Sequence, residues 1–307
     1  MKITVLGAGA LGGYYGGWLA EAGADVTFLV RPARKAALDA AGLIVESAVG
    51  ALKRPVRTVT TETVAPDADI VLLACKAYDL DEALAAVKPA MGPQTAILPI
   101  LNGMSHIDRL VERFGANRVI GGLCKIQATL GADGRIIHMN DWNEIIFGEL
   151  DGTMSERVVS LANLFPKPQA RAQAVGDIRF QLWKKLVHLG TVATVTTLTR
   201  QALGKVNRSK DGPWLIESTL EAAARIAAAE GYAMPATFME DYRKTFRSAG
   251  SAYKASMLRD MEKGNQAEGE HIIGYLRDRA AHHGIDAPVF RIAAANVQTY
   301  EVARRIG

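Results

Sequence analysis

A glycine-rich turn near the start of the chain could bind a phosphorylated ligand. Gly7, Gly9 and Gly12 fit the pattern G-x-G-x-x-G, in the stretch Gly7-Ala8-Gly9-Ala10-Leu11-Gly12. The pattern follows a short apolar segment and opens a segment with helical spacing. In that context the glycines let backbone N–H groups and a helix N-terminus approach a pyrophosphate. We therefore predict a dinucleotide site here, the alternative being a glycine turn without a ligand.

Arg31 stands where the second strand of such a site ends, 19 residues after Gly12. In NAD-binding sites an acidic side chain at this point accepts a hydrogen bond from the ribose 2′-hydroxyl. A guanidinium group cannot accept that bond, but it can pair with a 2′-phosphate. Arg31 therefore predicts NADP(H) as the cofactor, unless it is an ordinary surface charge.

Two polar residues follow apolar segments that are typical of buried parallel strands. Lys76 comes just after the first of these segments, and Asn102 comes after the next one. The carboxyl ends of parallel strands border the crevice in which ligands bind. We expect Lys76 and Asn102 near the nicotinamide ribose, with capping of the strand ends as the alternative.

The second half of the chain offers further candidates for acid–base chemistry and binding. Lys184 and Lys185 are adjacent on a long apolar helix and therefore point about 100° apart. A partly buried lysine there would be suited to proton donation, because desolvation lowers its pKa; periodicity does not choose between the two. Ser256 and Glu268 could face one cleft, from a loop or helix start and from a helix, respectively.

The pattern of apolar residues along the chain indicates an α/β domain followed by an all-helical domain. Residues 1–30 have βαβ spacing, residues 67–75 and 94–103 indicate buried strands, and residues 134–139 and 144–150 indicate a terminal hairpin. Helical periodicity dominates after about Pro168. We predict a Rossmann-type doubly wound NADP-binding domain over 1–168 and a helical substrate domain over 169–307, with the ligand cleft between them.

Composition excludes several classes of protein. The 307 residues have a net charge of +4 and are 49% apolar, which suits two filled cores. The basic residues are dispersed, so we expect an anionic small molecule rather than a nucleic acid. No apolar stretch approaches the roughly 20 residues of a membrane span, and we expect no signal peptide. Cys75 and Cys124 have no metal-ligand spacing and indicate reduced thiols in a cytoplasmic protein without a metal.

The assembled motifs resemble the ketopantoate reductases (2-dehydropantoate 2-reductases) over essentially the whole chain. The resemblance rests on GAGALGG, Arg31, CKAYD, LNGM, WKKL, SMLRDMEKG and HGIDAPV in this order. It implies an NADPH-dependent enzyme of pantothenate biosynthesis that reduces a 2-oxo acid to a 2-hydroxy acid. It places the catalytic lysine at Lys185, cofactor contacts at Lys76, Asn102, Glu268 and near Gln127, and substrate contacts at Asn102 and Ser256.

The chain departs from this family at the substrate wall. Asparagines that bind the substrate in the best-known members are replaced here by Leu189, Ala193 and, approximately, Leu203. These replacements argue against ketopantoate as the substrate, but they leave the class of reaction unchanged. The alternatives are a reductase of a less polar 2-oxo acid on the same scaffold and a non-catalytic NADPH sensor. The long helices could supply the surface of a homodimer.

Overall fold

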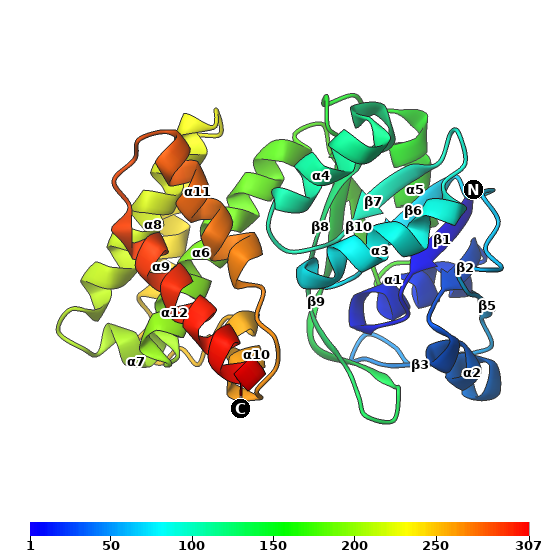
Figure 1. Cartoon of the computed structure of the whole chain (residues 1–307), viewed down its shortest axis with the longest axis horizontal. Helices are drawn as coiled ribbons and strands as arrows, with labels where there is room; N and C mark the ends of the chain where they lie inside the picture. Colours follow the sequence, from blue (N-terminus) through cyan, green and yellow to red (C-terminus); the bar gives the residue numbers. More distant parts are fainter. Residues whose placement is uncertain (307) are drawn as a thin grey trace. The chain divides into compact units, whose positions relative to one another are not determined.

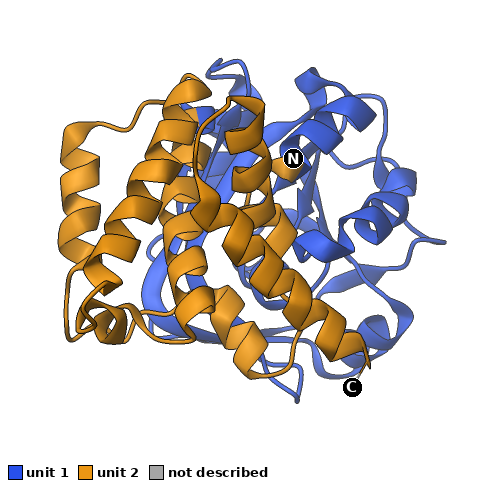
Figure 2. Cartoon of the chain, turned by 60° about the vertical axis from the view of Figure 1, so that its left-hand side comes forward, with its two compact units in different colours: residues 1–101, 106–179 blue, residues 102–105, 180–307 orange. Residues whose placement is uncertain are grey.

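A computed structural model of the chain describes residues 1–306 and divides it into two compact units (Figure 2). The first unit comprises residues 1–101 and 106–179, and the second comprises 102–105 and the residues from 180 onward. The predicted domain boundary lies at 168/169 instead. The first unit extends further because β10 (Arg171–Ala174) pairs with β9 (Ile136–Glu149) in one of its sheets. The separate roles assigned to the two domains stay predictions.

The first unit contains a parallel sheet with the strand order β5-β2-β1-β6-β7 (Figure 1). All its neighbouring strands are parallel. The predicted βαβ unit and the two predicted buried strands are confirmed, so the fold is a doubly wound α/β sheet. The strands are β1 (Lys2–Leu6), β2 (Asp25–Leu29), β5 (Arg57–Val59), β6 (Ile70–Leu73) and β7 (Ala96–Pro99).

Helices and short helical turns lie between the strands of the first unit along the chain. The α-helices are α1 (Ala10–Glu21), α2 (Pro32–Ala41), α3 (Leu80–Val87), α4 (Ser105–Phe114) and α5 (Glu156–Leu164). The 3₁₀ turns are η1 (Ala77–Asp79), η2 (Lys88–Ala90) and η3 (Ala116–Arg118). The start of α3 follows β6 through η1, and α4 follows β7 after a short loop, so both helices begin near the carboxyl ends of parallel strands.

A second sheet in this unit corrects the predicted hairpin. Residues 134–139 and 144–150 do not pair with each other, because β9 runs through both and pairs with β8 (Ile120–Leu130). Between the pairs Ile126–Asn143 and Ala128–His138, β8 advances two residues while β9 advances five. The predicted polar turn is therefore a bulge inside one strand, and the His138 ring lies 2.8 Å from the Trp142 carbonyl across it. The sheet is completed by β10 and by β3 (Leu43–Glu46) with β4 (Leu52–Arg54).

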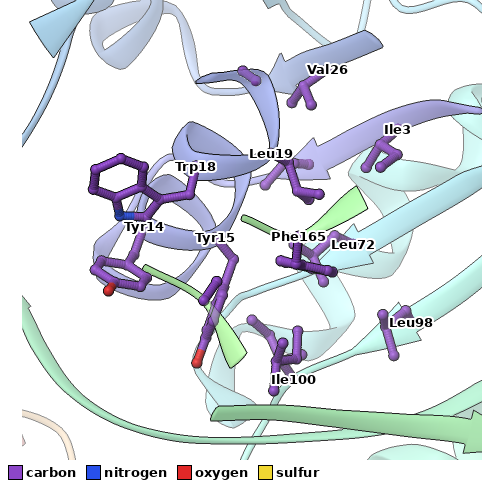
Figure 3. Close-up of a cluster of buried hydrophobic side chains, with 14 of the residues drawn as sticks. Ile3, Tyr14, Tyr15, Trp18, Leu19, Val26, Leu72, Leu98, Ile100 and Phe165 are labelled. Atoms are coloured by element: carbon purple, nitrogen blue, oxygen red, sulfur yellow. The ribbon is translucent and has the colours of Figure 1, made fainter. Parts of the chain in front are cut away.

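Helix α1 packs against both sheets of the first unit, which explains why it contains four glycines. A Cβ on Gly16 would lie 2.8 Å from the Phe28 ring, and a Cβ on Gly17 would lie 2.7 Å from Leu43. Phe28 belongs to the first sheet and Leu43 to the second. Figure 3 shows aromatic side chains of α1 beside apolar side chains of the parallel strands in this core. The glycines allow a close approach that larger side chains would prevent.

The second unit is helical, as predicted. It contains most of α6 (Ile178–Thr199), then α7 (Leu203–Asn207), α8 (Gly212–Ala229), α9 (Ala236–Phe246), α10 (Ser256–Glu262), the π-helical turn η4 (Glu270–Gly274), α11 (Tyr275–His282) and α12 (Pro288–Ile306). Ser256 begins α10, as one of the two expected layouts had it. Glu268 lies in the segment just before η4 and not within a helix as expected, because α10 ends at Glu262. Among residues 1–306, no helix is long and apolar enough to cross a bilayer.

Candidate active site

The glycine turn has the geometry of a phosphate-binding turn. Gly7 has a φ angle of 90°, and its N–H donates to the Leu29 carbonyl of the neighbouring strand. A Cβ on Gly12 would collide with the Gly7 carbonyl oxygen, so only glycine permits this packing of α1 on β1. A Cβ on Gly9 would meet no heavy atom within 4 Å. The turn thus presents bare backbone and the N-terminus of α1 to open space, which fits the pyrophosphate of a dinucleotide.

Arg34 braces this turn from the neighbouring helix. Its guanidinium donates to the Ala8 carbonyl through Nε and one terminal nitrogen, at 3.2 and 3.0 Å. The same terminal nitrogen also donates to the Gly134 carbonyl, at 3.1 Å, in the loop that joins β8 to β9. Partial burial lowers the pKa of the Arg34 guanidinium. Arg34 therefore stabilises the conformation of the glycine turn, a role that the sequence analysis missed.

Arg31 occupies the N-cap position of α2, two residues beyond β2, and its side chain makes no capping hydrogen bond. Its Nε and one terminal nitrogen donate to the two carboxylate oxygens of Glu82 in α3, at 3.1 and 2.8 Å. Both side chains are mostly exposed. Arg31, which is predicted to bind a 2′-phosphate, is thus paired with the carboxylate of a residue in α3.

The two other residues predicted to contact the cofactor in this unit lie at irregular points of the fold. Lys76 is exposed and occupies the N-cap position of the 3₁₀ turn η1, three residues beyond β6. Gln127 stands opposite the bulge of β9, where the pairing register of β8 shifts. Bulges re-aim side chains and are frequent beside active sites. Lys76 and Gln127 therefore lie outside regular strand geometry, which spacing along the sequence could not predict.

Asn102 and Lys185 lie together in the second unit. The Lys185 ammonium donates to the Asn102 side-chain oxygen over 3.0 Å. Lys184 points elsewhere, with its Nζ 5.3 Å from the centroid of the Phe238 ring. Both lysines are half-buried. The neighbouring lysines thus have different partners, an amide oxygen for one and an aromatic face for the other.

The turn that carries Asn102 packs against the π-helical turn η4. Gly103 has a φ angle of 86°, and a Cβ on it would collide with the carbonyl oxygen of His271. Two residues further, the Ser105 hydroxyl lies 3.1 Å from Nδ1 of the same histidine. π-Helical turns occur often at functional sites. Here the contacts of Gly103 and Ser105 with His271 restrict the backbone beside Asn102.

Gly103→Ala is expected to lower the free energy of unfolding more than the same change at a glycine that has open space around it. The matched control is Gly231→Ala, because Gly231 has a φ of 89° but no heavy atom within 4 Å of a built Cβ. The control should lose about 1–2 kcal/mol of unfolding free energy from the left-handed backbone alone. Gly103→Ala should lose at least about 2 kcal/mol more, from overpacking. Urea titrations of both variants measure the two losses of unfolding free energy. Equal losses would contradict the proposed packing of Gly103 against η4.

His188, one turn beyond Lys185, lies in an aromatic cluster. Its Nε2 is 2.7 Å from the Tyr253 hydroxyl, and its ring packs edge-on against Tyr242 and Phe246. Burial raises the pKa of both tyrosine hydroxyls, so they remain protonated. This cluster ties α6 to α9 and to the segment that leads into Ser256.

The remaining candidate residues differ in accessibility. Leu189 and Ser256 are half-buried, whereas Glu268 is 5% exposed and Ala193 is 2% exposed. Leu203 is fully buried, and its N–H donates to the Tyr253 carbonyl. Of the three apolar replacements, Leu189 is therefore the one with exposed side-chain surface, four residues along α6 from Lys185.

Comparison with known proteins accounts for both units. The model of the family "Ketopantoate reductase PanE/ApbA" matches residues 3–152, and the model of its C-terminal region matches residues 177–301. The chain belongs to the ketopantoate reductase family. It is therefore an oxidoreductase of that family, and the resemblance predicted from its motifs is confirmed.

Relatives within and near the ketopantoate reductase family span the full chain. The chain is 35% identical over 305 residues to the uncharacterized oxidoreductase YkpB of Bacillus subtilis, covering 99% of this chain and 100% of that protein. It is 29% identical over 290 residues to the 2-dehydropantoate 2-reductase of Archaeoglobus fulgidus, covering 94% of both. The crystal structure of the 2-dehydropantoate 2-reductase from Geobacter metallireducens superposes with a TM-score of 0.87 at 27% identity, covering 97% of this chain and 99% of that one.

The structure shows contacts of four further residues that the sequence analysis did not predict. Arg34, Glu82, His188 and His271 each contact a predicted site residue or its immediate neighbourhood. Helical spacing could have indicated His188, because it lies three residues from Lys185 and therefore on nearly the same face. Nothing in the local sequence indicates the other three, whose partners are distant along the chain.

Proposed function

We propose that this protein is an NADPH-dependent reductase that converts a 2-oxo acid to the corresponding 2-hydroxy acid. The observation that carries the proposal is the 3.0 Å hydrogen bond from Lys185 to Asn102. When bound, the cofactor supplies a hydride to the keto carbon. A non-catalytic sensor of NADPH would have no need of an oriented ammonium group.

Lys185 is the proton donor in this proposal. As an ammonium group it polarises the keto oxygen and then protonates the alkoxide that develops there. Asn102 accepts one N–H of the ammonium and so directs the remaining donors. Lys184 does not take this role, because its ammonium lies over the Phe238 ring.

The other polar residues bind and orient. In this proposal Ser256 takes the substrate carboxylate, and Glu268 binds the nicotinamide end of the cofactor. Lys76 and Gln127 are proposed as further cofactor contacts. The turn from Gly7 to Gly12 receives the pyrophosphate, with its donors held by the brace from Arg34. Arg31 receives the 2′-phosphate and so makes NADPH the preferred cofactor.

The substrate proposed is a 2-oxo acid with an apolar branched tail, rather than ketopantoate. Leu189 lies four residues from Lys185 and so on nearly the same face of α6. Ketopantoate carries a hydroxyl group, and desolvating a hydroxyl beside leucine without a partner costs about 1–3 kcal/mol. Ala193 is buried and supports the same apolar wall.

The test compares kcat/KM for ketopantoate and for a 2-oxoisovalerate-like acid, followed by the loss of NADPH absorbance. We expect the branched apolar acid to be preferred. Leu189→Asn should shift the ratio toward ketopantoate by about fivefold or more, the lower end of that desolvation cost. Leu198→Asn, a half-buried leucine on another face of α6, is the control and should leave the ratio unchanged.

Two outcomes would contradict the proposal. A preference of the unmodified protein for ketopantoate by about tenfold or more would remove the apolar-wall argument and leave ketopantoate as the substrate. No NADPH oxidation with any acid of a 2-oxo acid panel would remove the reductase proposal itself and favour a sensor.

A further inference from the structure

The ion pair of Arg31 with Glu82 joins two segments that border the expected dinucleotide site. In the parallel sheet, β2 and β6 lie on either side of β1. Arg31 follows β2, and Glu82 lies in the first turn of α3, which follows β6. The pair therefore spans the carboxyl end of β1, from which the glycine turn leads into α1. Strand order reverses at this point of the sheet, where ligands bind in such folds.

Arg31 differs from the other cations of its segment in the kind of partner it has. Arg34 is committed to two backbone carbonyls, and Lys35 pairs with Asp39 of its own helix and contacts Thr58. Arg31 presents its planar fork to a single carboxylate, with side chains 72% and 63% exposed. An exposed ion pair of this kind is weak, so a stronger anion can exchange with Glu82.

The two members of the pair suit opposite cofactors. A 2′-phosphate requires the same guanidinium donors that Glu82 occupies, and a carboxylate nearby repels it. A free 2′-hydroxyl requires an acceptor, which a carboxylate supplies in NAD-binding sites. We propose that Glu82 sets the ratio of NADP to NAD binding, by competing with the 2′-phosphate for Arg31 and by accepting from the 2′-hydroxyl of NAD. This inference rests on the proposed role of Arg31.

The test measures dissociation constants of NADP⁺ and NAD⁺ by calorimetry for the unmodified protein and for Glu82→Gln. The variant should bind NADP⁺ about three- to fivefold more tightly and NAD⁺ about two- to fivefold more weakly, as expected for exchange of an exposed charged partner. Because Glu82 is mostly exposed, the thermal unfolding midpoint should not change.

Asp81→Asn is the matched control, since it removes the same charge one residue away. Asp81 is 84% exposed and pairs with Arg109 instead of Arg31. Its ratio of NADP⁺ to NAD⁺ affinity should stay within about twofold of the unmodified protein, because long-range effects between exposed charges are screened by salt. A shift equal to that of Glu82→Gln would overturn the inference, and so would an unchanged ratio in Glu82→Gln.

Arg31→Ala separates this inference from the proposed function. If Arg31→Ala loses the preference for NADP⁺ while Glu82→Gln matches the unmodified protein, Arg31 reads the phosphate and only the role of Glu82 is wrong. If Arg31→Ala leaves the ratio unchanged, the proposed cofactor assignment and the inference both fail. Binding of neither dinucleotide to the unmodified protein would also overturn both.

Discussion

Lys185→Ala is expected to lower kcat by at least about a hundredfold, the usual contribution of a positioned general acid. The half-buried ammonium of Lys185 donates to Asn102, and in the proposed reaction its other N–H groups face the keto oxygen. The dissociation constant for NADPH, measured by fluorescence titration, should remain nearly unchanged because the lysine acts on the substrate. Steady-state kinetics with the preferred 2-oxo acid measure the loss.

Lys184→Ala is the matched control, a change of the same residue type at the adjacent position of α6. Removing its ammonium from the Phe238 ring should cost about 0.5–1 kcal/mol of stability, the worth of a weakly desolvated cation–π contact. Its kcat should stay within about threefold of the unmodified protein, far from the effect of losing an acid. The reverse pattern, with the large loss at Lys184, would make Lys184 the proton donor and refute the assignment made from the Asn102 contact.

Arg31→Asp is expected to weaken NADPH binding by about 1.5–3 kcal/mol, the worth of charge-assisted hydrogen bonds. This corresponds to a dissociation constant roughly 10- to 150-fold higher. NADH binding should change far less, because NADH lacks the 2′-phosphate. Fluorescence titrations of both cofactors against the variant measure the difference.

Arg57→Asp controls for the reversal of charge in this experiment. Arg57 lies on β5 of the same sheet and, like Arg31, is an exposed arginine paired with one carboxylate, here Asp25. It should affect both cofactors weakly and equally. Equal weakening of NADPH and NADH by Arg31→Asp would show that Arg31 does not read the phosphate.

Local patterns of the chain were sufficient for most of the fold. The spacing of apolar residues predicted β1, α1, β2, β6, β7 and the long helices of the second unit, because burial of one face or of a whole strand imposes that periodicity. The hairpin at residues 134–150 was wrong for a physical reason. Asn143 belongs to the polar residues 140–143 that were predicted as the turn, but it is buried and donates to the backbone carbonyls of Pro168 and Gln169.

Part of the candidate site could also be predicted from the sequence, and part could not. The turn from Gly7 to Gly12 is readable from sequence, because its requirements are steric and act between near neighbours: a positive φ at Gly7 and no Cβ at Gly12. The family resemblance is equally readable, since it depends on motifs and their order. Sequence patterns alone were therefore enough to predict the class of fold, the dinucleotide turn and the family.

The partner of each charged side chain depends instead on tertiary packing. Lys184 and Lys185 are indistinguishable by periodicity, and they differ because Asn102, 83 residues away, accepts from Lys185. Arg31 meets Glu82 across 51 residues, and Ser105 meets His271 across 166. Such contacts depend on how strands and helices are placed by packing of the whole core, and no local preference of the chain encodes them.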